Sequence, residues 1–538
     1  MRYPSGALVI KTSIGGCKIA GKQDKKRKCH IPTEDEIIQK RKDPVFIAQL
    51  IDDFDIIVEN LDFDNPDCSG FGIAYFIAES FCKYTIVLKE NGKQDKKTEL
   101  NDEQTRIIEK ALYLCRLSVY NTYYKEQQFG NSVDYYWYAV NTHILYAEIL
   151  GILRRYYESI DVLRMARSFF KTYNTITNHD SSDVIRLEER LELEEIRMAY
   201  DGMRNNGPMA TLYLSHYIIK WKDLLVSEIR NKDIRDVLTK SLSGLEDISK
   251  VINDRDNPLP PLFKEEFEQP TDKEEYTYRK FCWDNNLFLS SFNSVYPYYY
   301  LVGKHPYNMM RECIDLEDYA EECKILMADI MLSYCHSRYL WYLNINGIDS
   351  DKNYPVERIV DPRIIGFRTV STEPLIDCFT RCYSVLDKVA KVVQYEFGIE
   401  IYDKKGEKTY AYYSNLTYTI RKSKELSSNP FLMNLVSLYR EISPPDNYKR
   451  DYAMWPDFEK INSIRNHIMH SGFAIVDEDF KKTTSKSDLI AYLSLIELQI
   501  QTERLLFIVK NAIMYSDSAI RMNRRNQDKL NKVKTKST

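Results

Sequence analysis

The sequence predicts a mainly α-helical protein with more than one domain. Apolar residues recur at the three- and four-residue spacing of a buried helical stripe over most of residues 101–250 and again in the C-terminal half. Runs typical of β-strands are few and short. The 538 residues also exceed what a single hydrophobic core usually covers, so we expect two or three domains.

Residues 1–100 form a mixed N-terminal segment. Two runs, Ala7–Ile10 and Tyr84–Leu88, resemble strands, but two are too few to predict a sheet domain. Between them, Pro44–Asn60 is amphipathic. Six aspartates lie in or just after this stretch: Asp52, Asp53, Asp55, Asp62, Asp64 and Asp67. Because the glycine and terminal glutamate of a calcium loop are missing, we interpret the cluster as a solvated face.

Residues 101–250 predict a domain of helical hairpins. A helical stripe follows Asp102, and four more helices are expected after it: Tyr138–Arg154, Tyr157–Phe170, Val184–Arg204 and Met209–Val226. The first two meet at a short bend and resemble one tetratricopeptide-type hairpin. Stacked hairpins of that kind form extended surfaces for proteins or RNA, and an irregular all-α domain is the alternative. Residues 251–274 are rich in proline and predict a linker.

The C-terminal half predicts an antiparallel four-helix bundle within residues 275–515. Its helices are expected at Leu316–Leu343, Thr372–Phe397, Asp457–His470 and Ser487–Met514. A loop-rich, tyrosine-rich insertion, Gly398–Lys449, separates the second helix from the third. Residues 516–538 are interpreted as a basic tail.

Composition and charge limit the function without naming it. The formal net charge is −4, so any contact with nucleic acid has to be local. No apolar run approaches the length of a membrane span, and no secretory signal is present. The 11 cysteines, an odd number without a repeating spacing, are therefore expected to be reduced, in the cytoplasm. A metal site at Cys17, Cys29 and His30 is disfavoured because no CxxC accompanies them.

The motif that carries chemistry is Arg465-Asn466-His467-Ile468-Met469-His470, with Gly472 near the expected helix C-cap. At about 100° per residue, Arg465 and His470 lie about 140° apart around the axis. A loosened last turn would let His470 approach Arg465. His467 lies about 60° from His470 and is expected to pack in the bundle, with an auxiliary catalytic role as the alternative.

The motif resembles the signature of the HEPN superfamily, an arginine and asparagine followed by a histidine on a helix of a four-helix bundle. Arg465, Asn466 and His470 match that signature in its fullest form. The segment Tyr278–Leu289 is also similar to the lead-in of a bacterial HEPN subgroup with helical N-terminal regions. The resemblance covers roughly residues 275–515. It implies a dimeric, metal-independent endoribonuclease without a cofactor, acting as a toxin or in defence against phage.

The residue types suit RNA cleavage. RNA supplies its own nucleophile, the 2′-hydroxyl, so the protein has only to move protons and stabilise charge on the phosphate. A histidine titrates near neutral pH, and an arginine binds phosphate with two parallel hydrogen bonds. Asn466 can orient either group. Because the matched position offers one histidine and the reaction needs an acid and a base, we expect a two-fold homodimer with a composite active site.

Two other functions compete with this one. Pro456-Asp457 followed by Asp479-Phe480-Lys481 has the spacing of a metal-dependent PD-(D/E)xK nuclease, but Asp457 begins a predicted helix rather than lying on a strand. The bundle and hairpins together also suit a non-catalytic scaffold or nucleotide-binding module. Phosphate-loop, dinucleotide-loop and HExxH motifs are missing from the sequence. The N-terminal helical region is expected to receive a protein or ligand trigger.

Overall fold

The structure is a computed structural model, and it divides the chain into two compact units. One unit comprises Met1–Ile149 and Met165–Ser181, the other Leu150–Arg164 and Ser182–Thr538. The residues described are 31–91, 100–130, 132–177, 182–203, 272–285, 287–289, 319–346, 372–402, 407–442, 459–470, 472–476 and 490–537. Within these ranges the chain is mainly α-helical, as predicted.

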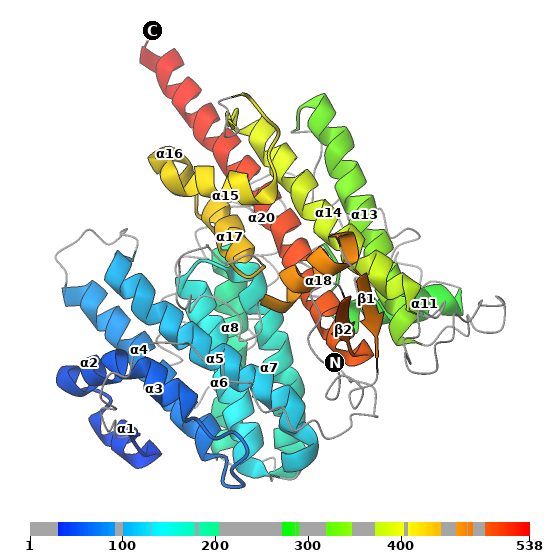
Figure 1. The fold of residues 1–538 in the computed structure, drawn as a ribbon. Helices are drawn as coiled ribbons and strands as arrows, with labels where there is room; N and C mark the ends of the chain where they lie inside the picture. Colours follow the sequence, from blue (N-terminus) through cyan, green and yellow to red (C-terminus); the bar gives the residue numbers. More distant parts are fainter. Residues whose placement is uncertain are drawn as a thin grey trace, which may run out of the picture. The chain divides into compact units, whose positions relative to one another are not determined.

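The first unit is a set of helices around an aromatic core (Figure 1). Its helices are α1 (Glu34–Lys40), α2 (Pro44–Asp52), α3 (Phe54–Glu59), α4 (Ser69–Asn91), α5 (Asp102–Phe129) and most of α6 (Val133–Ile152). Thr33 and Asp43 cap α1 and α2, and Asn101 forms a capping box with Gln104 at the start of α5. The core includes Phe71, whose ring centroid lies 5.0 Å from that of Phe63.

The predicted strand at Tyr84–Leu88 is wrong, because these residues belong to α4. Phe81, Cys82 and Thr85 are buried at helical spacing against the neighbouring helix, so tertiary packing overrides the β-branched character of the run. The other predicted strand, Ala7–Ile10, lies outside the described residues. In the described part of the chain α4 is also the one helix long and apolar enough to cross a membrane; 61% of its window is buried, as in a core helix.

The acidic cluster of the first unit behaves as a solvated face. Asp64 forms an ion pair with Lys125, and the side chains of Asp62 and Asp67 accept hydrogen bonds from nearby backbone N–H groups. Among the residues that the structure describes, no three His, Cys, Asp or Glu side chains converge as metal ligands. Cys17, Cys29 and His30 lie outside those residues.

The predicted helical hairpin is present. α6 ends at Ile152, and α7 (Tyr156–Ile176) begins after a bend in which Arg154 has a φ of +62°. α8 (Ser182–Met203) follows. Residues 150–164, including the first turns of α7, belong to the second compact unit. The helix expected at Met209–Val226 and nearly all of the 251–274 linker lie outside the described residues.

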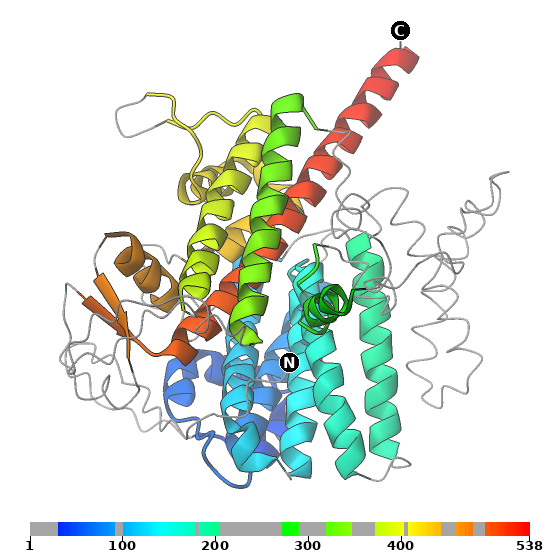
Figure 2. The same ribbon diagram turned by 90° about the vertical axis from the view of Figure 1, so that its right-hand side faces the viewer.

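Three long helices lie side by side in the second unit (Figures 1 and 2). They are α13 (Glu321–Ile345), α14 (Glu373–Glu396) and α20 (Leu495–Ser537). α14 presents an apolar stripe at helical spacing, with Leu375, Phe379 and Val389 fully buried. Burying each such side chain contributes about 1.5–3 kcal/mol, so this stripe fixes the bundle. α20 runs to Ser537, so the predicted basic tail 516–538 is largely a continuation of this helix.

The predicted loop-rich insertion Gly398–Lys449 also contains helices. α15 (Tyr413–Lys422), α16 (Lys424–Ser427) and α17 (Pro430–Arg440) fold within it. α17 packs along α20 and takes much of the place expected for the motif helix in the bundle. The motif helix, α18 (Glu459–His470), instead packs beside two short parallel strands, β1 (Gly472–Ile475) and β2 (Ile490–Leu493).

α11 (Lys273–Asp284) packs on α13 and includes the start of the segment Tyr278–Leu289 that resembles a HEPN lead-in. The buried guanidinium of Arg338 on α13 donates from Nε to Tyr278 Oη at 3.0 Å. From Nη1 it donates to the Leu287 carbonyl at 3.1 Å. The lead-in is therefore attached to the bundle by a buried polar side chain as well as by aromatic packing.

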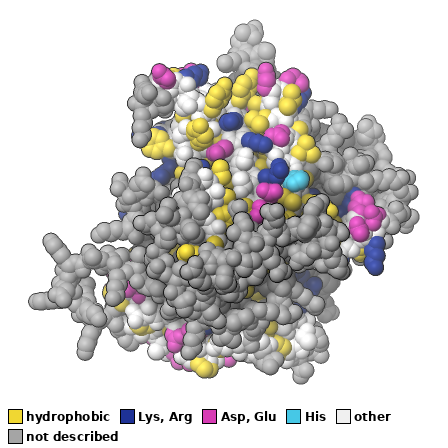
Figure 3. All heavy atoms as spheres, turned by 45° about the vertical axis from the view of Figure 1, so that its right-hand side comes forward, with side chains coloured by type: hydrophobic (Ala, Val, Ile, Leu, Met, Phe, Trp, Pro, Cys, Tyr) yellow, Lys and Arg dark blue, Asp and Glu magenta, His cyan; other side chains and the backbone are white. Residues whose placement is uncertain are grey.

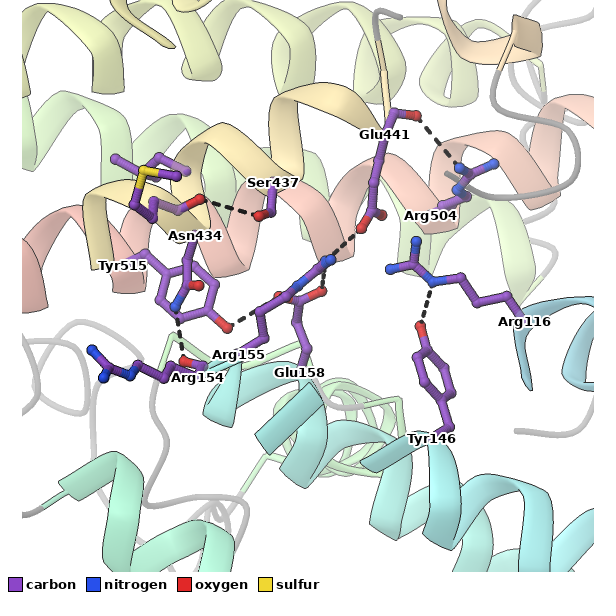
Figure 4. Close-up of polar contacts among 12 residues, drawn as sticks. Arg116, Tyr146, Arg154, Arg155, Glu158, Asn434, Ser437, Glu441, Arg504 and Tyr515 are labelled. Atoms are coloured by element: carbon purple, nitrogen blue, oxygen red, sulfur yellow. Dashed lines mark hydrogen bonds and ion pairs between the residues drawn. The ribbon is translucent and has the colours of Figure 1, made fainter. Parts of the chain in front are cut away.

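A buried polar network joins the beginning of α7 to α17 and α20 within the second unit (Figure 4). Arg155, just before α7, forms ion pairs with Glu158 and with Glu441 at the end of α17. Tyr515 of α20 donates to Glu158 at 3.0 Å. Lys510, one turn earlier on α20, pairs with Asp161. All these side chains are almost completely buried, so each charge relies on its partner.

Candidate functional site

The motif residues lie on α18, whose apolar side faces the bundle. Ile461 and Ile464 are buried, whereas Arg465 is half-buried and Asn466 is exposed. The spacing of these residues turns the arginine and asparagine away from the core while the isoleucines anchor the helix. Arg465 and Asn466 are thus accessible to solvent on a helix that the packing of its isoleucines holds in place.

Gly472 lies two residues after the end of α18, near its C-cap as predicted. It is the first residue of β1, which pairs in parallel register with β2, Gly472 opposite Ile490 and Ile475 opposite Leu493. The run Phe473-Ala474-Ile475 that follows the glycine is apolar, and Ile475 is buried against the fold. The paired strand β1 therefore begins two residues after the end of the motif helix.

Arg465 is held from two sides by neutral groups. Its Nη1 donates to Asn466 Oδ1 at 3.1 Å. Its Cζ lies 5.2 Å from the centroid of the Tyr383 ring on α14, within cation–π range. Within the described residues no carboxylate forms an ion pair with Arg465, in contrast to Arg155 with its two glutamates. Guanidinium donors therefore remain available for an anion.

A cavity of about 230 Å³ opens beside Arg465, between α14 and α18. Its lining comprises Phe379, Thr380, Tyr383, Ser384 and Asp387 from α14, and Arg465, Ile468 and Met469 from α18. Burial raises the pKa of the Tyr383 hydroxyl to about 12, although the neighbouring Arg465 charge opposes the shift. The tyrosine is consequently a neutral hydrogen-bond donor at physiological pH.

The two motif histidines have different places. His467 is half-buried, and its Nδ1 is buried without a hydrogen-bond partner among the described residues. His470 is the last residue of α18, and its side chain lies outside the described part of the structure. The helix stays α-helical to His470, so the predicted loosening of its last turn is absent. Within one chain, helix positions 465 and 470 thus lie about 140° apart around the axis.

The comparisons with known proteins fit this geometry. Residues 317–523 match the family described as LA2681-like HEPN. The C-terminal region is a HEPN domain. No curated protein and no solved structure gives a significant match to the chain.

The matched range of the HEPN domain contains every predicted site residue: Arg465, Asn466, His467 and His470. The match begins at residue 317, later than the start at 275 expected from the sequence, and it ends at residue 523, further along α20 than the expected end at 515. The lead-in at Tyr278 lies outside the match, although it packs on α13. The domain boundaries at residues 100, 250, 274 and 515 remain predictions.

Two residues of the HEPN domain site were not predicted. Tyr383 and Asp387 lie on α14 at the spacing of one helical turn, and both line the cavity with Arg465. In the sequence they belong to an ordinary amphipathic helix, and nothing local pairs them with the motif. The residues of the competing metal-nuclease hypothesis, Asp457, Asp479 and Lys481, lie outside the described residues.

Surface charge around the HEPN domain is mixed. On the described surface seen in Figure 3, basic and acidic side chains are interspersed among hydrophobic ones rather than gathered by sign. This agrees with the formal net charge of −4. An anionic ligand bound there would depend on particular cations such as Arg465 rather than on a broad basic field.

Proposed function

We propose that this chain is a metal-independent endoribonuclease whose HEPN domain cleaves RNA through attack of the 2′-hydroxyl. The observation that supports it most is the state of Arg465. It is half-exposed beside a cavity, positioned by Tyr383 and Asn466, and has no carboxylate partner in the described residues. Such a guanidinium is suited to bind a phosphate with two parallel hydrogen bonds.

The reaction requires one proton to be removed and one to be supplied. A neutral imidazole takes the 2′-hydroxyl proton, and the 2′-oxygen forms a bond to phosphorus. Arg465 offsets the charge that develops on the phosphoryl oxygens. The bond from phosphorus to the 5′-oxygen breaks, and that oxygen receives a proton from an imidazolium. The products are a 2′,3′-cyclic phosphate and a 5′-hydroxyl.

We assign the imidazole role to His470 and propose that the active site is completed by a second copy of the chain. Positions 465 and 470 of α18 lie about 140° apart around the helix axis, so they do not share one face of the helix. A two-fold arrangement of two α18 helices would supply two arginines and two histidines to one cleft. Asn466 orients Arg465 through its 3.1 Å hydrogen bond, and His467 is an auxiliary candidate because of its unpartnered Nδ1.

The test is incubation of purified full-length protein with total cellular RNA in EDTA, followed by mapping of fragment ends. We expect cleavage, with cyclic phosphate ends, that is lost in His470→Ala and Arg465→Ala. His336→Ala and Arg421→Ala are matched controls, because both residues are exposed on other helices of the domain, and they should cleave normally. Parent-like cleavage by both site variants contradicts the assignment.

Loss of cleavage in EDTA would instead favour the metal-dependent nuclease. Failure to cleave in any buffer, combined with nucleotide binding, would favour a non-catalytic HEPN scaffold. Dimerisation is tested separately by sedimentation equilibrium, and by mixing His470→Ala protein with parent protein. If the active site is composite, the mixture should be less active than its content of parent protein alone, because a mixed dimer has one histidine in a cleft where the acid and the base require two.

We also propose that the protein acts as a toxin or anti-phage effector and that its N-terminal helical region receives the activating signal. The hairpin α6–α7 and the size of this region support the proposal. Expression of a chain beginning at Leu150 should arrest bacterial growth more strongly than the full chain. Equal toxicity of the two would count against inhibition by the N-terminal region, and parent-like toxicity of His470→Ala would count against RNA cleavage as its cause.

A further inference from the structure

The cavity between α14 and α18 has the size and position of a subsite beside a bound phosphate. Arg465, the proposed phosphate ligand, forms part of its wall. Its volume of about 230 Å³ is below the roughly 300 Å³ at which pockets for drug-sized ligands begin. A single planar ring system is therefore the kind of group that fits it. In RNA the group next to each phosphate is a ribose bearing such a ring, a nucleobase.

The walls of the cavity are apolar on both sides. Phe379 and Tyr383 come from α14, and Ile468 and Met469 come from α18. Met469 is 54% exposed, so this part of the apolar wall is accessible to a ligand. Bases bind between aromatic and aliphatic side chains because their faces are apolar while their edges are polar.

The cavity lining includes one carboxylate, that of Asp387, besides the Arg465 guanidinium. Asp387 Oδ1 accepts the backbone N–H of Tyr413 at 3.0 Å, which fixes the orientation of the side chain. Asp387 and Arg465 line the same cavity, and no ion pair joins them in the described residues. An ionised carboxylate only accepts hydrogen bonds, whereas the hydroxyls of Thr380 and Ser384, also in the lining, can donate or accept.

We infer that this cavity is a nucleobase pocket in which Asp387 selects guanine. The inference rests on the proposed function, since it places the base next to the phosphate held by Arg465. Guanine presents two adjacent donors, N1–H and N2–H, which match the two oxygens of a carboxylate. Adenine and cytosine present one amino group each. Uracil presents one N–H between two carbonyl oxygens, and a carboxylate repels those oxygens.

The decisive variant is Asp387→Asn in the full-length protein. Its amide oxygen can still accept the Tyr413 N–H, so the fold at the start of α15 is kept, while a donor replaces one acceptor. Asp377→Asn is the matched control, because Asp377 is exposed on the same helix and does not line the cavity. Both proteins are compared with the parent on oligonucleotides that differ only in the base beside the cut.

Parent protein and Asp377→Asn should prefer guanosine over uridine at one position by about tenfold or more, the discrimination of one bidentate base contact. Asp387→Asn should lose most of that preference. If the parent cleaves RNA without a guanosine preference, or if Asp387→Asn keeps the preference, the inference is wrong while the proposed function stands.

A binding measurement separates the pocket from catalysis. His470→Ala protein is titrated calorimetrically with guanosine 3′-monophosphate and with uridine 3′-monophosphate. We expect the guanosine nucleotide to bind about tenfold more tightly or better, and adding Asp387→Asn should remove the difference. Selective binding by a protein that never cleaves RNA would overturn the ribonuclease function and keep the pocket. Equal binding of both nucleotides, or binding of neither, overturns the proposed nucleobase pocket. Binding of neither is the result expected if a partner chain fills the cavity.

Discussion

The buried ion pair between Arg155 and Glu441 predicts a large effect of one substitution, Glu441→Ala. The two side chains are 2% and 3% exposed, so water cannot replace a lost partner. Removing one member of a buried pair costs about 3–5 kcal/mol because the remaining charge stays buried. Arg155 keeps its second partner, Glu158, so we expect the lower end of that range, about 3 kcal/mol.

Glu400→Ala provides the comparison within the same unit. Glu400 pairs with Lys408 at 3.1 Å, but the two side chains are 58% and 66% exposed. Pairs as exposed as this one contribute little to stability, because water solvates both charges. Urea denaturation of both variants, followed by circular dichroism, measures the difference in the free energy of unfolding. If Glu441→Ala lies within about 1 kcal/mol of Glu400→Ala, the buried network does not stabilise the unit as we argue.

Three further predictions concern other side chains. Tyr383→Phe should retain RNA cleavage within about twofold, because the aromatic ring beside Arg465 remains. Tyr383→Leu should lower cleavage about 2- to 30-fold, the range of a cation–π contact. An equal loss in both variants contradicts this role of the ring. Lys510→Met leaves the buried Asp161 carboxylate without its cation, so it should destabilise the protein by about 3 kcal/mol or more at neutral pH. That deficit should shrink in acid, because burial raises the pKa of Asp161 and the folded variant takes up a proton; a pH-independent deficit refutes the argument. Burial lowers the pKa of His143 to about 4, below its unfolded value of about 6.5. The free energy of unfolding should therefore fall, by at most about 3 kcal/mol, as the pH drops from about 6.5 to about 4. Denaturation of His143→Gln at several pH values should no longer show this dependence.

The long helices could be predicted because their apolar residues repeat over many turns. The structure has α14 at Glu373–Glu396, against an expected Thr372–Phe397, since Thr372 and Phe397 flank the helix as its caps. No helix was predicted within the insertion Gly398–Lys449, where α17 lies. Asn429 caps this helix and Pro430 is its first residue, a favourable start for a helix of only 11 residues.

The residues of the candidate site could also be predicted only in part from the sequence. Arg465, Asn466 and His470 are close in sequence, so local spacing was enough to single them out. Tyr383 and Asp387 meet Arg465 only because α14 and α18 pack together, and no local pattern records that contact. The short strands β1 and β2 were missed for a related reason. Four-residue apolar runs are too short to distinguish a strand from a helix end before the partner strand is known.

The membership of residues 150–164 in the second unit makes that unit discontinuous in sequence. A gene fragment that starts at residue 275 would encode α13, α14, α17, α18 and α20 but omit the partners of Glu441, Lys510 and Tyr515. The excised protein would then lose the ion pairs that Arg155 and Asp161 supply to Glu441 and Lys510, and poor folding could be mistaken for absence of activity. Transfer of this HEPN domain to another protein therefore requires two pieces of chain, and a recombination event within the first piece would break these ion pairs.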